Sequence, residues 1–200
     1  MAIDRRLLHN IEWSLLLASL LVAGIGVATI LSATHNTRFS TIYVKQLYAL
    51  GLGLMALLIA SGIDYRRLVD RAHLLYVPTV AALVAVLLWG PRIAGTKRWF
   101  LLGGLQVQPS EFAKLVAALF VAKFFAESKK DSLGVRDILA PGAAIGLLCV
   151  LIAAEPDLGT AFTLVPIFLT AAFLGGLRMK ALLGLVLAGA VVGGLGWMVA

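Results

Sequence analysis

Long apolar runs with few charges are the feature that most constrains this chain of 200 residues. A helix needs about 20 residues to cross roughly 30 Å of hydrocarbon, and seven runs reach or approach that length. The shorter runs can gain length from flanking residues. We therefore predict an all-α, polytopic helical bundle that forms one transmembrane domain over residues 1–200. The runs are Trp13–Ala33, Ile42–Ile63, His73–Gly90, Phe112–Ala126, Ile138–Ala154, Ala161–Gly176 and Ala181–Ala200.

Composition agrees with a membrane protein. Hydrophobic residues make up 61% of the chain and charged residues 14%, whereas a soluble domain carries about 25% charged residues. A net charge of +7 would suit nucleic acid in a soluble protein. The basic residues are dispersed among short loops, so we predict membrane lipids as the surroundings and no nucleic-acid partner.

Alternate loops lie on the same side of the membrane, and the two sets differ in their number of basic residues. The poorer set holds Arg38, Arg92, Lys97 and Arg98, with Lys45 near one helix start. The richer set belongs in the cytoplasm, so we expect a cytoplasmic N-terminus. That set is Arg5, Arg6, Arg66, Arg67, Arg71, Lys129, Lys130, Arg136, Arg178 and Lys180. The last run stops without a polar tail, and we expect the chain to be the N-terminal part of a longer protein.

The predicted outer loop between the third and fourth runs carries basic and aromatic residues. Arg98 can hold a phosphate through two parallel hydrogen bonds, while Lys97 acts as a point charge. Trp99 suits the headgroup level, where amphipathic rings anchor. An ordinary interfacial anchor remains the alternative interpretation of this loop.

The next helix is expected to begin at Pro109 or Ser110, because proline is favoured at the first helical position and serine at the cap. Glu111 would then complement the positive end of the helix dipole. Lys114 follows on the same face, and a lysine one turn inside a membrane helix is costly unless it is paired or functional. The two residues are either a structural pair or the floor of a cationic pocket.

A second polar segment, Glu155–Thr160, separates the fifth and sixth runs. Pro156 would end the helix before it, and Asp157 could cap the helix after it. The two carboxylates that flank Pro156 could also bind a metal, hold a cation such as Arg98, or act as a base. The simpler alternative is a helix cap beside a surface carboxylate. The histidines are scattered and predict no metal site.

Taken together, the two polar segments resemble the two hallmarks of the SEDS family, which includes RodA, FtsW and SpoVE. The run GTKRWFLLGGLQVQPSEFAK, Gly95–Lys114, is similar to the first hallmark, and EPDLGTA, Glu155–Ala161, is similar to the second. The triplet Lys97–Trp99 and the run IDYRRL, Ile63–Leu68, resemble the rod-shape branch more than the division branch.

This resemblance implies a bundle of about ten membrane helices, of which the chain would hold the first seven. It implies peptidoglycan glycosyltransfer on lipid II at the outer face of the cytoplasmic membrane, with a class B penicillin-binding protein as partner. The catalytic Asp proposed for the family lies in an outer loop after helix seven. The catalytic residue is therefore expected beyond residue 200, and the 200 residues alone are expected to be inactive. A divalent cation, Mg or Mn, near that Asp is compatible with this reading.

The candidate substrate-binding residues combine the charges with this resemblance. Arg98 and Lys114 would stabilise the donor pyrophosphate, with Lys97 as a weaker candidate. Glu111 would orient Lys114 or Arg98, and Asp157 would shape the pocket. The full set is Lys97, Arg98, Trp99, Gln108, Ser110, Glu111, Lys114, Glu155, Asp157 and Thr160.

Three alternatives stay open at this point. A flippase or transporter for the lipid-linked precursor could use the same groove, since charged residues inside spans suit transport. The polar residues gather at the predicted outer side, which favours surface chemistry over a path through the membrane. A structural scaffold for the elongation machinery and a division-type, FtsW-like paralogue are the other two.

Overall fold

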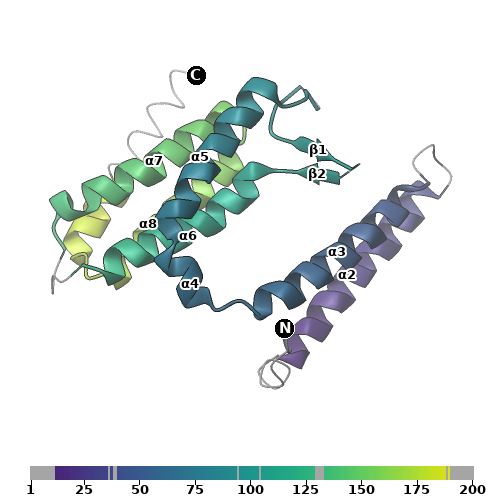
Figure 1. Ribbon diagram of the computed structural model, residues 1–200, viewed down its shortest axis with the longest axis horizontal. Helices are drawn as coiled ribbons and strands as arrows, with labels where there is room; N and C mark the ends of the chain where they lie inside the picture. The colour runs from purple at the N-terminus through teal and green to yellow at the C-terminus, as the bar shows by residue number, and fades with distance from the viewer. Residues whose placement is uncertain are drawn as a thin grey trace. The chain divides into compact units, whose positions relative to one another are not determined.

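The computed structural model describes residues 12–35, 37, 40–93, 95–103, 105–128, 133–187 and 189. Over these residues the chain is mainly helical (Figure 1). It divides into two compact units, Met1–Tyr65 and Arg66–Ala200, and each is considered by itself. A single transmembrane domain over residues 1–200 stays a prediction.

The first unit is a helical hairpin of α2 (Trp13–Thr34) and α3 (Ile42–Ser61). Its helices contain no buried residue. A hairpin of two helices taken by itself therefore leaves most of its apolar side chains uncovered. The hydroxyls of Ser19 and Thr29 donate to backbone carbonyls four residues earlier, both at 2.8 Å. These polar groups are thus satisfied within α2, which lipid requires because it offers no hydrogen bonds.

The second unit packs its helices around α6, which contacts α5, α7 and α8. Small residues on α6, Ala113 and Ala117, are fully buried and let the neighbouring helices approach closely. Leu83, Leu148 and Leu164 fill the core from the three surrounding helices. The elements are α4 (Tyr65–Asp70), α5 (Ala72–Trp89), β1 (Phe100–Leu102), β2 (Leu105–Val107), α6 (Pro109–Ala126), the 3-10 helix η1 (Val135–Ile138), α7 (Leu139–Ala154) and α8 (Leu158–Leu174).

Six of the seven predicted spans coincide with helices, with ends that differ by a few residues. Among the described residues, four helices are long and apolar enough to cross a membrane: Trp13–Thr34, Ile42–Ser61, Ala72–Trp89 and Val135–Ala154. The helix α8 is apolar but has 17 residues, and α6 has 18 residues that include three charged ones. The seventh predicted span, Ala181–Ala200, lies mostly outside the described residues, as do Arg5, Arg6, Arg38, Lys129 and Lys130.

The loop at 90–110 contains a β-hairpin that the sequence analysis did not predict. The strands β1 and β2 pair antiparallel with Phe100 opposite Val107 and Leu102 opposite Leu105. Gly103 at the turn has φ +58°, a conformation that glycine adopts without steric cost. The segment between α3 and α5 also contains the short helix α4.

Polar contacts fix the C-terminal end of α6. The Lys123 ammonium donates to the backbone carbonyl of Asp70 and lies 3.3 Å from Nδ1 of His73. It also lies 3.7 Å from Oε1 of Glu127, one turn further along α6. These contacts join the α4–α5 corner to the last turn of α6.

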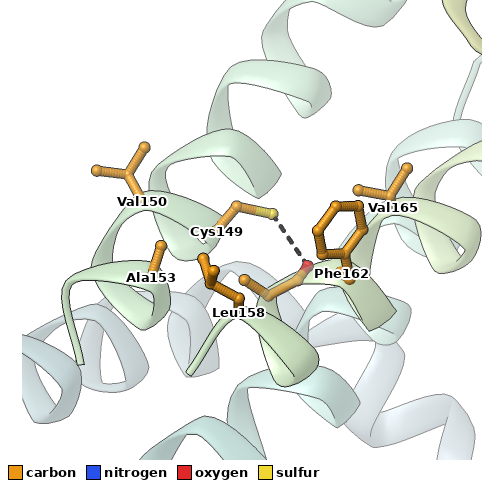
Figure 2. Close-up of a pocket in the computed structure, with 7 residues that line it drawn as sticks. Cys149, Val150, Ala153, Leu158, Phe162 and Val165 are labelled. Carbon is orange, nitrogen blue, oxygen red and sulfur yellow. Dashed lines mark hydrogen bonds between the residues drawn. The ribbon is translucent and has the colours of Figure 1, made fainter. Parts of the chain in front are cut away.

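A small apolar groove of about 270 Å³ lies between α7 and α8 (Figure 2). The thiol of Cys149 donates to the carbonyl of Ala161 at 3.6 Å across the two helices. Phe162 and Val165 form the α8 side of the groove, and Val150 and Ala153 lie on the α7 side. The groove therefore ends next to the loop that carries Glu155.

The packing predicts a stability effect at Gly175, which caps the end of α8. A Cβ added there would lie 2.8 Å from Cβ of Phe125, a side chain only 6% exposed. We expect Gly175→Ala to lower the free energy of unfolding by about 1–3 kcal/mol through overpacking. Thermal unfolding in detergent measures this change.

Gly146→Ala is the matched control, since an added Cβ at this α7 position meets no atom within 4 Å. We expect it to be neutral or to stabilise by up to about 1 kcal/mol, because alanine favours the helix. Equal unfolding temperatures for the two variants would contradict the steric argument.

Candidate functional site

Three chain segments bring polar side chains together at one end of the second unit. Gln108 Nε2 donates to Asp157 Oδ2 at 2.7 Å. Arg98 Nη1 lies 3.7 Å from the same carboxylate oxygen. Arg98 comes before β1, Gln108 follows β2, and Asp157 follows α7. These three residues are called the Arg98–Asp157 cluster below.

Local structure positions each member of this cluster. Asp157 is the N-cap of α8, where its Oδ1 accepts from the backbone N–H of Thr160 at 3.2 Å. This confirms the predicted cap. Gln108 is the N-cap of α6 with an extended backbone, so Pro109 takes the first helical position. Pro109 therefore confirms the predicted start of α6, whereas Ser110 lies inside the helix and is not the cap.

Charge and hydrogen bonding keep Asp157 ionised. Burial acts to raise the pKa of Asp157, but the hydrogen bonds from Thr160 and Gln108 and the charge of Arg98 outweigh it. The pKa of the carboxyl therefore lies below its usual value. An ionised Asp157 next to a partly exposed Arg98 orients a guanidinium that still has N–H groups to offer a ligand.

Glu155 lies two residues earlier in a different environment. Its side chain is fully buried, and within the described part of the chain neither carboxyl oxygen has a hydrogen-bond partner. Burial raises the pKa of Glu155 to about 7, the charge of Asp157 acts in the same direction, and the charge of Arg98 opposes both. The loop thus holds two carboxyl groups whose pKa values are pushed apart, a pattern typical of functional sites.

Glu111 and Lys114 form an ion pair of 2.8 Å on the first turns of α6. Among the described residues, the carboxylate within 4 Å of Arg98 is that of Asp157, so Glu111 orients Lys114 and not Arg98. Ser110 is fully buried, and its hydroxyl has no partner among the described atoms. The start of α6 therefore combines a partly exposed cation with a buried hydroxyl.

Lys97 and Trp99 lie on either side of Arg98 but do not join the cluster by a hydrogen bond among the described residues. The Lys97 ammonium donates to the carbonyl of Leu88 at 3.0 Å and lies 3.4 Å from the carbonyl of Leu87. It therefore satisfies carbonyls at the end of α5. Trp99 is partly buried.

Thr96 is a residue that the sequence analysis missed. Its hydroxyl accepts from Nε of Arg98 at 2.9 Å, whereas Asp157 lies near Nη1, so the two residues hold different nitrogens of the guanidinium. The hairpin was also missed, although two short apolar runs around a Gly-Gly pair are a known hairpin signal. The hairpin is what brings Gln108 to the same place as Arg98.

Metal-binding groups are not gathered in the part of the chain that the structure describes. It contains no group of three or more His, Cys, Asp or Glu side chains that could hold a metal ion. Asp157 and Glu155 supply two carboxyl groups, but Asp157 already accepts hydrogen bonds at both oxygens. The divalent cation that the family resemblance allows would lie near the Asp expected beyond residue 200, and that expectation stays a prediction.

The helices and the cluster define a class: a multi-pass helical membrane protein with a polar site at one end of its helices. Residues 7–199 match the family model described as "Cell cycle protein", which joins FtsW, RodA and SpoVE. The chain belongs to this family, as the two sequence hallmarks predicted. It is a multi-pass protein of the bacterial cytoplasmic membrane.

Among curated relatives, the chain is 32% identical over 181 residues to "Peptidoglycan glycosyltransferase RodA" of Treponema pallidum, covering 88% of this chain and 41% of that protein. It is 28% identical over 198 residues to "Probable peptidoglycan glycosyltransferase FtsW" of Bacillus subtilis, covering 94% and 49%. The chain thus spans about half the length of the curated relatives it matches.

Solved structures agree with this assignment. The fold matches RodA of Thermus thermophilus with a TM-score of 0.75 at 30% identity, over 92% of this chain and 60% of that one. It matches a chain from "Structural coordination of polymerization and crosslinking by a peptidoglycan synthase complex" with a TM-score of 0.78 at 31% identity, over 90% and 52%.

The buried Glu155 predicts a pH-dependent stability. Between pH 4.5, the ordinary pKa of this carboxyl, and pH 7, the folded state binds more protons than the unfolded state. Stability therefore falls as pH rises through this window and is level above it. We expect Glu155→Gln to remove this slope and to be the more stable protein at pH 8, by about 3 kcal/mol.

Thermal unfolding of both proteins in detergent at pH 5 and pH 8 tests this expectation. Glu111→Gln serves as the control, because the Glu111 side chain is exposed and its removal should leave the wild-type slope in place. A Glu155→Gln variant with the same pH slope as the wild type would show that Glu155 does not carry the effect.

Proposed function

We propose that the protein containing this chain is a peptidoglycan glycosyltransferase that polymerises lipid II for cell elongation. The Arg98–Asp157 cluster is the observation that carries the proposal. It sets an oriented guanidinium at the end of a membrane-embedded bundle, where the headgroup of a lipid-linked substrate would lie. The names of the relatives support the same activity.

Lipid II carries a disaccharide-peptide on an undecaprenyl pyrophosphate. An enzyme acting on it needs a groove open to lipid and a cation for the pyrophosphate. Arg98 is suited to this role because Thr96 and Asp157 fix its guanidinium while 29% of the side chain stays exposed. Lys114 is 30% exposed and would add a second positive charge close to the same headgroup.

The reaction joins the acceptor sugar to the donor sugar. The acceptor 4-hydroxyl gives its proton to a carboxylate base, and its oxygen attacks the anomeric carbon of the donor. Undecaprenyl pyrophosphate leaves with the bonding electron pair, and its growing negative charge is what Arg98 would stabilise. We expect the base to lie outside these 200 residues, as the family resemblance implies, so Asp157 would act as a positioning group for Arg98.

A class B penicillin-binding protein is the proposed partner. It would crosslink the glycan strands that this protein makes. The likeness to a chain from a peptidoglycan synthase complex supports this proposal. The rod-shape features Lys97–Trp99 and IDYRRL favour the elongation machinery over a division-type role.

Loss of Arg98 should strongly reduce polymerisation. We expect Arg98→Ala to lower the rate of glycan synthesis by roughly a hundredfold or more, the usual effect of removing one group that stabilises developing charge. Arg98→Lys should also be impaired, because an ammonium cannot reproduce the planar fork. Lipid II polymerisation by the intact protein with its partner is the measurement.

Arg92→Ala is the matched control, since Arg92 is an exposed cation of the same loop. It should keep near-normal synthesis. Near-normal glycan synthesis by Arg98→Ala would remove the assigned role. Transfer of lipid II across liposome membranes without any polymer would favour the transporter instead.

A further inference from the structure

The β1–β2 hairpin exposes large apolar side chains. Leu101 is 55% exposed, Leu102 is 61% exposed and Leu105 is 38% exposed. Three exposed leucines within five residues are more than a water-facing hairpin of this size usually carries. In Figure 1 the hairpin projects from the end of the α5–α6 pair, away from the helices of its own unit.

One face of the hairpin continues an apolar surface of the helices. Side chains alternate along a strand, so Leu102 and Leu105 lie on the same face as Phe100 and Val107. Phe100 and Val107 line a groove of about 360 Å³ that they share with α5 and α6. The exposed leucine pair therefore continues the wall of this groove along the hairpin.

The hairpin starts close to the boundary of the membrane. The helix α5 ends at Trp89, which is 76% exposed, and α6 begins two residues after β2 ends. A tryptophan at this position is typical of the interface between hydrocarbon and water. A three-residue strand spans about 10 Å, so a hairpin that starts at this boundary can reach through the headgroup layer into the outermost part of the hydrocarbon and no deeper.

Charge points to anionic lipid as the neighbour. Residues 89–108 include no Asp or Glu, and their charged residues are Arg92, Lys97 and Arg98. A basic segment next to apolar side chains complements a surface of anionic phospholipids. A soluble protein partner would not require the leucine pair to continue a groove between membrane helices.

We propose that the β1–β2 hairpin inserts into the leaflet at the start of α6, with Leu102 and Leu105 in hydrocarbon and the exposed Arg92 at anionic phosphates. Because Arg98 comes before β1 and Gln108 follows β2, insertion of the hairpin holds both residues at the phosphate level. The hairpin is then a membrane anchor for the cluster, whichever reaction the cluster serves.

Depth-dependent quenching tests the proposal in the intact protein. The protein is placed in nanodiscs of phosphatidylethanolamine and phosphatidylglycerol, in a background where Cys149, the single cysteine of this chain, is replaced by Ala together with any cysteine elsewhere. Leu102→Cys carries an environment-sensitive dye. The matched control is Gln106→Cys, an exposed position on the opposite face of the hairpin.

At residue 102 we expect quenching by nitroxide-labelled lipid to be several-fold stronger than at residue 106. Quenching by aqueous iodide should show the reverse order. Leu105→Cys, on the same face as Leu102, should behave like Leu102→Cys and provides a second site if that variant unfolds. Replacing phosphatidylglycerol with phosphatidylcholine should weaken lipid quenching at residue 102.

Two results would overturn the proposal. The first is equal, strong iodide quenching at residues 102 and 106, which would leave the hairpin in water. The second is shielding of residue 102 that appears only when a protein partner is added, which would make the leucine pair a protein-docking surface. Either result would leave the proposed glycosyltransferase activity untouched, since polymerisation is measured separately.

Discussion

The Asp157 carboxylate joins parts of the chain that are far apart in sequence. It caps α8 through Thr160, accepts a hydrogen bond from Gln108 and attracts Arg98. A largely covered carboxylate is costly without such partners, so the same contacts that satisfy Asp157 also fix the geometry of the site. Because Gln108 caps α6 and Arg98 precedes the hairpin, one ion sets the relative positions of two helix starts and a loop. The rest of the second unit brings these segments close enough to contact Asp157.

The features that follow from local physics could be predicted from the sequence. Apolar runs of spanning length gave six helices, and the cap at Asp157 and the helix start at Pro109 followed from residue type. The pairing of Asp157 with Arg98 was one of several options that the charges left open. The hairpin had a signal in the two short apolar runs around a Gly-Gly pair, whereas the role of Thr96 depends on how the segment folds back on itself. Lys97 was likewise expected to bind the substrate. In the structure its ammonium donates to a carbonyl at the end of α5.

The burial of individual polar side chains could not be predicted from the sequence. Glu155 and Asp157 are two residues apart and chemically alike, yet one is fully buried without a partner and the other is held by several hydrogen bonds. The difference arises because the turn after α7 directs one side chain inward and the other toward α6. Ser110 adds a second buried polar atom without a described partner. Buried polar groups without hydrogen-bond partners destabilise a fold. They are therefore expected at positions where the residue serves function and not stability.

The helix α6 touches each of its three large neighbours and is held by polar contacts at both ends. Its 18 residues make a rod about 27 Å long, close to the thickness of the hydrocarbon layer. A helix held at both ends cannot tilt at one end without straining the contacts at the other. A displacement at the Lys123 end would therefore be transmitted to Gln108 at the N-terminal end of α6 through one continuous helix.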